Sequence, residues 1–151
     1  MRLKKLLAEG QLRKHNTSAK EIAELLAIVE RDLKDASQPD LSIDRRFATA
    51  YSAALQLATV ALHAAGYRTV GHGHHWATLH VLPEIMGSKA QNRADYLDAC
   101  RTKRNVTDYD RAGGISEGEL AEVLDEVRKF RSDLLEWLRT RHPHLLSHEQ
   151  P

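Results

Sequence analysis

Apolar residues recur at helical spacing along most of the chain, and the first such stretch has charged residues on its opposite face. Ser18 and Glu21 precede it at the spacing of a capping box, in which both side chains satisfy free amides at a helix start. The pattern predicts a helix that begins after Ser18 and ends near Ala36. Its apolar positions are Ile22, Leu25, Leu26, Val29 and Leu33.

The next stretch predicts the central helix of the fold, with Ser42 placed to cap it and Gly66 to end it. Residues 47–66 contain no Lys, Arg, Asp or Glu and are long enough to cross a bilayer. One narrow stripe of weakly polar residues makes insertion unfavourable. We therefore expect a buried helix that packs on several sides, and no membrane partner. The stripe consists of Thr49, Ser52, Gln56, Thr59 and His63.

Three further helices are predicted, over residues 75–85, 88 to about 104, and 116–141. Pro83 is expected to end or kink the first of them. Ser88 and Ser116 each stand three residues before a glutamine or glutamate, again the spacing of a capping box. No segment alternates apolar and polar residues as a strand does, so strands are not required. The sequence predicts an all-α fold, a bundle of four to five helices.

A chain of 151 residues has the usual size of one domain. We expect an N-terminal extension over residues 1–17, the helical bundle over 18–141 and a flexible tail over 142–151. The basic start of the chain meets Glu9 before any long apolar run, so no signal peptide is expected.

The charges nearly balance, with 22 Lys and Arg against 21 Asp and Glu and a net charge of +1. This balance excludes a generally basic coat for nucleic acid but leaves room for a local basic patch. Cys100 is the only cysteine, which excludes an internal disulfide and a multi-cysteine zinc site and fits a reducing, cytoplasmic location. It is predicted to be a small core residue.

Polar chemistry is concentrated near the end of the helix that begins at residue 88. Arg101, Arg104 and Asp108 share one helical face, and Asn105 and Tyr109 form a neighbouring pair. Two guanidinium groups beside an amide and a phenol suit a phosphate-bearing ligand, because arginine binds phosphate through two hydrogen bonds and the others can contact a base. The alternative is a surface salt bridge between Arg104 and Asp108, with Tyr109 packed under the following loop.

Most of residues 18–140 resembles a HEPN domain (higher eukaryotes and prokaryotes nucleotide-binding). Residues 46–58 are similar to that family's alanine-rich second helix, and residues 74–79 to the short helix that follows. Residues 104–109 are similar to its hallmark motif, an arginine, a polar neighbour and a histidine about five residues after the arginine. The resemblance implies a compact helical bundle that forms a homodimer.

In HEPN ribonucleases the motif arginine and histidine of two protomers form a composite, metal-independent site on RNA, without a cofactor. The resemblance therefore gives Arg104 and Asn105 a phosphate-facing, catalytic role, with Tyr109 at the histidine position. A tyrosine with an ordinary pKa near 10 is no base at neutral pH. If the chain is a ribonuclease, a histidine from residues 72–75 must supply the base, and His74 and His75 join Arg101, Asp108 and the motif residues as RNA-binding candidates.

The resemblance also implies a partner. Some bacterial relatives are toxins, and a nucleotidyltransferase partner adenylylates a tyrosine two residues after the motif histidine. Arg111 occupies that position here, which leaves Tyr109 as a stand-in acceptor. We expect a nucleotide- or RNA-binding domain, a ribonuclease toxin or the partner of a nucleotidyltransferase or antitoxin. The alternative, favoured by the missing histidine, is a non-catalytic helical dimer that serves as a protein-interaction module.

His72, His74 and His75 are a weak alternative as metal ligands. Neutral imidazoles bind zinc, copper or nickel, and a glycine-rich turn can direct several toward one ion. No cysteine lies nearby, the closest acidic residue downstream is Glu84, and the spacing matches no closed tetrahedral set. We therefore predict no metal site in this turn.

Overall fold

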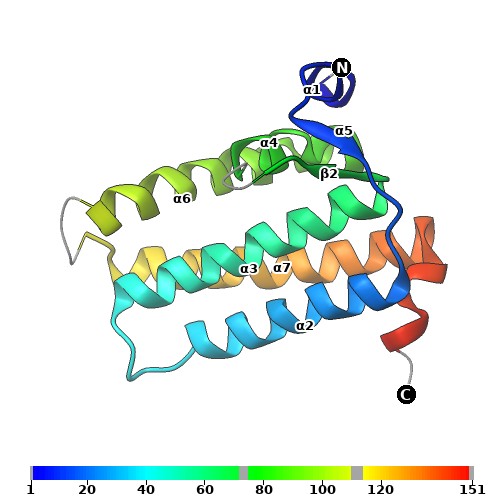
Figure 1. Ribbon diagram of the computed structural model, residues 1–151. Helices are drawn as coiled ribbons and strands as arrows, with labels where there is room; N and C mark the ends of the chain where they lie inside the picture. The colour runs from blue at the N-terminus through cyan, green and yellow to red at the C-terminus, as the bar shows by residue number, and fades with distance from the viewer. Residues whose placement is uncertain (1, 72–74, 110–113, 150–151) are drawn as a thin grey trace.

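Long helices build the molecule, as the spacing of apolar residues predicts. The structure is a computed structural model that describes residues 2–71, 75–109 and 114–149. Its long helices are α2 (Ala19–Ala36), α3 (Ile43–Ala64), α6 (Gln91–Tyr109) and α7 (Glu117–Arg141). Figure 1 shows α3 and α7 side by side in the middle of the bundle, with α2 below them and α6 above. The predicted all-α bundle is confirmed.

Helix α3 is the central helix, because it packs against α2, α6, α7 and the short helices that precede α6. Its alanines allow these neighbours to approach closely, and Ala50, Ala54 and Ala58 are fully buried. Among the helices that the structure describes, none combines the length and apolar character needed to span a membrane. The buried helix expected over residues 47–66 is confirmed.

Serine caps begin three of the helices. The Ser18 and Ser42 side chains accept hydrogen bonds from the amides of Glu21 and Arg45, at 3.1 and 3.2 Å. Ser116 and Glu119 form a complete capping box at the start of α7. Ser88 differs from the prediction, because it begins a 3-10 turn, η1 (Ser88–Ala90), and α6 starts only at Gln91.

The predicted helix over residues 75–85 is divided into α4 (His75–His80) and α5 (Leu82–Met86). Pro83 lies in the first turn of α5. Proline is tolerated there because the amide it lacks has no partner within the helix. The expectation that Pro83 ends or kinks a single helix is corrected accordingly.

The N-terminal segment contradicts the prediction that no strand is needed. Helix α1 (Arg2–Ala8) is followed by strand β1 (Leu12–Lys14), which pairs antiparallel with β2 (Tyr67–Thr69). Three residues are too few to show an alternating pattern, which explains why the sequence does not reveal these strands. Leu6 and Leu12 are buried against Leu62, Ala77 and Val81, so the predicted extension packs on the bundle.

The end of the chain, as far as the structure describes it, also differs from the flexible tail predicted for residues 142–151. Residues Pro143–Glu149 form the 3-10 helix η2, which packs on α2 and α7. Leu145 and Leu146 are buried in the main core. Burial of each leucine stabilises this packing by about 1.5–3 kcal/mol.

Cys100 is confirmed as a core residue. Its side chain is buried on α6, in the main core of the bundle. Burial raises the pKa of the thiol to about 11, so the reactive thiolate is scarce at neutral pH.

Candidate functional site

Three of the residues singled out from the sequence meet around a buried tyrosine. Arg101 and Arg104 lie on α6, and His75 is the first residue of α4. The Tyr51 hydroxyl, on α3, lies 3.4 Å from His75 Nδ1. The guanidinium carbon of Arg104 lies 5.9 Å from the centre of the Tyr51 ring, within the range of a cation–π contact. We call Tyr51, His75, Arg101 and Arg104 the arginine–histidine cluster.

Arg101 is held by its own helix. Its Nε donates to Asp98 Oδ1 at 2.9 Å, three residues earlier, and the side chain is about one quarter exposed (27%). An exposed pair of this kind contributes little stability, about 0.2–1 kcal/mol. The pair orients the guanidinium and leaves part of it in contact with solvent, where a ligand can reach it.

The two arginines change the protonation of the aromatic groups beside them. Burial is the main cause that lowers the pKa of His75, and the positive charges of Arg104 and Arg101 lower it further. Burial raises the pKa of Tyr51 to about 12, although both arginines act in the opposite direction. At neutral pH the cluster therefore holds a neutral imidazole and a neutral phenol near the guanidinium groups of Arg104 and Arg101, the latter paired with Asp98. This combination is chemically suited to an anion that also offers a hydrogen-bonding or ionisable hydroxyl.

The remaining predicted residues lie outside the part of the site that the structure describes. The backbone of α6 includes Asn105, Asp108 and Tyr109, but their side chains lie outside the described residues, as do His72, His74 and Arg111. The cluster therefore rests on Arg101, Arg104 and His75.

Tyr51 is the residue of the cluster that sequence reasoning missed. Its sequence signal is a tyrosine within residues 46–58, the alanine-rich segment that resembles the HEPN second helix. A tyrosine whose ring is fully buried usually keeps a partner for its hydroxyl. That requirement predicts a polar residue on a neighbouring helix, and in this fold the residue is His75.

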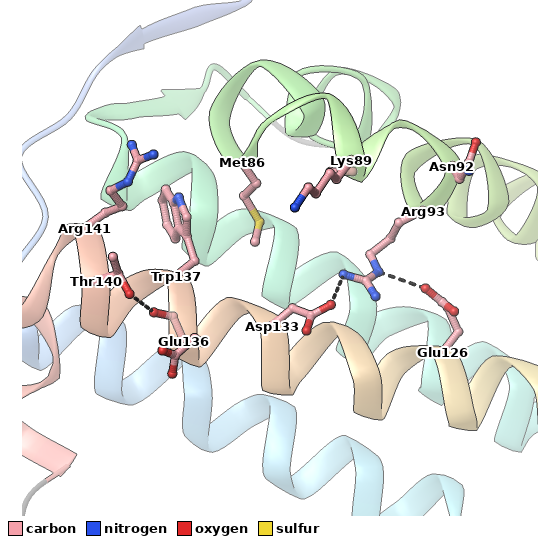
Figure 2. Close-up of a pocket in the computed structure, with 11 residues that line it drawn as sticks. Met86, Lys89, Asn92, Arg93, Glu126, Asp133, Glu136, Trp137, Thr140 and Arg141 are labelled. Carbon is pink, nitrogen blue, oxygen red and sulfur yellow. Dashed lines mark hydrogen bonds and ion pairs between the residues drawn. The ribbon is translucent and has the colours of Figure 1, made fainter.

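A second arginine environment lies at the start of the same helix, in a groove of about 540 Å³ between α6 and α7. Arg93 Nε donates to Glu126 Oε1 at 2.8 Å, and its Nη1 donates to Asp133 Oδ2 at 3.0 Å. Figure 2 shows the guanidinium between these two carboxylates, with Trp137 farther along α7. The guanidinium also lies 5.0 Å from the Phe130 ring centre. Both carboxylates belong to α7, so this arginine joins α6 to α7.

A third group of side chains could hold a metal ion. His15 Nε2 and His63 Nδ1 lie 2.8 and 3.0 Å from the same oxygen, Oε1 of Glu21. Sequence reasoning missed this group because His63 lies 42 residues from Glu21 and was read only as part of the polar stripe of the central helix. The spacing of the three residues follows no familiar metal motif.

Comparisons with protein-family models, curated proteins and solved structures find no match for this chain. Functional inference therefore depends on the chain's own residues and their arrangement.

Proposed function

We propose that the chain is a HEPN-like domain that binds a nucleotide or RNA phosphate at the arginine–histidine cluster. The observation that carries the proposal is the convergence of Arg104, Tyr51 and His75 from three helices, with Arg101 beside them. Arg101 and Arg104 bind the phosphate oxygens, because guanidinium groups donate paired hydrogen bonds to phosphate.

His75 is the base of the proposed reaction if the domain cleaves RNA. Its neutral imidazole can accept the proton of a ribose 2′-hydroxyl, whose oxygen then attacks the adjacent phosphorus without a metal ion. A 2′,3′-cyclic phosphate forms, the P–O5′ bond breaks, and the leaving 5′-oxygen takes a proton from the imidazolium or from water. Arg104 stabilises the charge that develops on the phosphate oxygens. This assignment supplies the base that is missing where Tyr109 replaces the histidine of the HEPN motif.

The proposal extends to the setting of the domain. It acts as a cytoplasmic homodimer, and its partner is a nucleotidyltransferase or an antitoxin that masks the cluster or modifies Tyr109. A homodimer brings two clusters into one assembly, as the composite HEPN site requires.

The test is cleavage and binding of end-labelled RNA in EDTA by the wild type, Arg104→Ala and His75→Ala. Arg139→Ala is the matched control, because this arginine is exposed on α7 and pairs only loosely with Glu136, at 3.7 Å. We expect EDTA-resistant cleavage that is lost in Arg104→Ala and His75→Ala and kept in Arg139→Ala. Binding that depends on Arg104 without cleavage would retain the ligand site and exclude the nuclease. Equal cleavage and binding in Arg104→Ala and the wild type would overturn the proposal.

The second candidate function is a non-catalytic protein-interaction module. Trp76 favours it, because this large apolar side chain is 43% exposed beside His75 and stacks on His80, with ring centres 4.1 Å apart. Exposed tryptophans are enriched at protein interfaces. RNA binding by the wild type separates the two candidates, because the interaction module binds no RNA. Light scattering then tests Trp76, since loss of the dimer in Trp76→Ala would assign this residue to an interface.

A further inference from the structure

Three side chains converge where the N-terminal segment meets the bundle. His15 follows strand β1, Glu21 lies in the first turn of α2, and His63 lies in the last turn of α3. One nitrogen of each histidine and one carboxylate oxygen lie within 4.8 Å of one another. We propose that His15, Glu21 and His63 form a binding site for a divalent transition-metal ion, with Zn²⁺ as the ion.

The donor set suits this chemistry. Two imidazoles and one carboxylate are a common three-ligand set for zinc, with a water or a further ligand in the fourth position. Zinc binds nitrogen and oxygen at about 2.0–2.2 Å, which separates tetrahedral ligands by about 3.3 Å. His15 Nε2 and His63 Nδ1 lie 2.8 and 3.0 Å from Glu21 Oε1, so small side-chain rotations make room for the ion.

The backbone holds two of the three ligands in place before any ion binds. The amide of His15 donates to the carbonyl of Gly66 at 2.8 Å, next to the β1–β2 pairing of Lys14 with Tyr67. Gly66 has φ +99°, a conformation that glycine adopts without strain, so the chain can turn sharply after α3 and bring its carbonyl to His15. Glu21 is fixed by the Ser18 cap and by the Thr17 hydroxyl, which donates to Glu21 Oε1 at 2.6 Å. Such outer contacts orient metal ligands.

The group is accessible from solvent and is not part of the sealed core. The side chains of His15, His63 and Glu21 are 18%, 16% and 34% exposed. The two imidazole rings pack against each other at a tilt of 60°, with their centres 4.7 Å apart. Because all three side chains are partly exposed, an ion can enter from solvent and keep one water ligand. Once bound, it ties the N-terminal segment to α2 and α3.

The competing explanation is a hydrogen-bonded group in which Glu21 simply bridges two histidines. Zinc titration by calorimetry of the full, EDTA-stripped chain distinguishes the two. We expect one zinc ion per chain and a rise in the thermal midpoint with zinc concentration, because an ion that binds only the folded state stabilises it. Glu21→Gln and His63→Ala should each lower the affinity by roughly tenfold or more.

His144→Ala is the matched control, since this exposed histidine lies on η2, and it should bind zinc as the wild type does. His72→Ala/His74→Ala tests the glycine-rich turn as the source of binding. Circular dichroism checks that each variant folds without metal. If Glu21→Gln or His63→Ala does not fold, zinc-induced shifts of the histidine ring signals in wild-type NMR spectra replace them, and we expect the His15 and His63 signals to move.

A dissociation constant for zinc above about 100 µM in the wild type would overturn the metal site. It is also overturned by binding that survives in both Glu21→Gln and His63→Ala, or that is lost only in His72→Ala/His74→Ala. The inference is independent of the proposed phosphate site, whose chemistry continues in EDTA.

Discussion

Helix α6 carries arginines in two contrasting environments. Near its start, Arg93 lies between Glu126 and Asp133 of α7, over the ring of Phe130. Eleven residues later, about 16 Å along the helix, Arg104 lies over the ring of Tyr51 near the imidazole of His75. The residue type and the helix are the same, and the neighbouring helices differ.

The contrast lies in the side chains that the neighbouring helices place beside each arginine. Helix α7 offers carboxylates that neutralise Arg93, and the guanidinium then joins two helices. Helices α3 and α4 offer Tyr51 and His75, which are neutral at pH 7 because burial moves the pKa of each away from ionisation. Under the proposed function, the second environment is the one that receives the ligand, because guanidinium groups bind anions.

The largest expected effect is on ligand affinity. Arg104→Ala should weaken binding of a short RNA by about 10- to 100-fold, since a hydrogen bond to a charged group contributes about 1.5–3 kcal/mol. Fluorescence anisotropy at fixed salt measures this loss. Arg93→Ala serves as the comparison and should bind RNA within about twofold of the wild type. An equal loss in both variants would remove the distinction between the two environments.

The second effect is on stability, and here the loss is expected at Arg93, whereas the loss of RNA affinity is expected at Arg104. Arg93→Ala should lower the free energy of unfolding by about 1–3 kcal/mol, because Glu126 loses its guanidinium partner at a position that is three-quarters buried. Urea denaturation measures the change. A loss below about 0.5 kcal/mol would place Arg93 among ordinary surface ion pairs.

The third effect concerns the pH dependence of His75. Burial and then the charges of Arg104 and Arg101 lower its pKa below 6.5, so the unfolded chain binds this proton more readily than the folded chain. His75 therefore costs no stability above its unfolded pKa and destabilises the fold progressively as the pH falls below that value. In Arg104→Ala the pKa should rise toward 6.5, which NMR titration of the His75 ring detects. An unchanged pKa would show that Arg104 does not act on the imidazole.

The smallest effect on stability is expected at Arg139, an exposed arginine that serves as the reference for Arg93 and Arg104. Its pair with Glu136 is long, at 3.7 Å, and both side chains are mostly exposed. Arg139→Ala should change the free energy of unfolding by less than about 0.5 kcal/mol in urea denaturation. A larger loss would mean that the exposed face of α7 stabilises the fold more than its contacts indicate.

Much of the fold was predictable from local signals. The serine caps at Ser18 and Ser116 and the apolar circumference of α3 act within a few residues, so they can be read without knowledge of the neighbours. The division between α4 and α5 was not predictable, because Pro83 is compatible with a helix end and with a helix start. The short strands could not be predicted, because their pairing joins Leu12 to Thr69, which lie far apart in the sequence.

By itself the sequence determined the helical class, the central place of α3 and the choice of Arg101 and Arg104 as candidates for phosphate binding. These depend on periodicity and on side-chain chemistry, which are properties of neighbouring residues. Only the tertiary structure decided that Tyr51 and His75 stand beside Arg104, and that His15 and His63 meet at one oxygen of Glu21. Such contacts depend on how the helices pack, and residues that are distant in the sequence show no local pattern that predicts them.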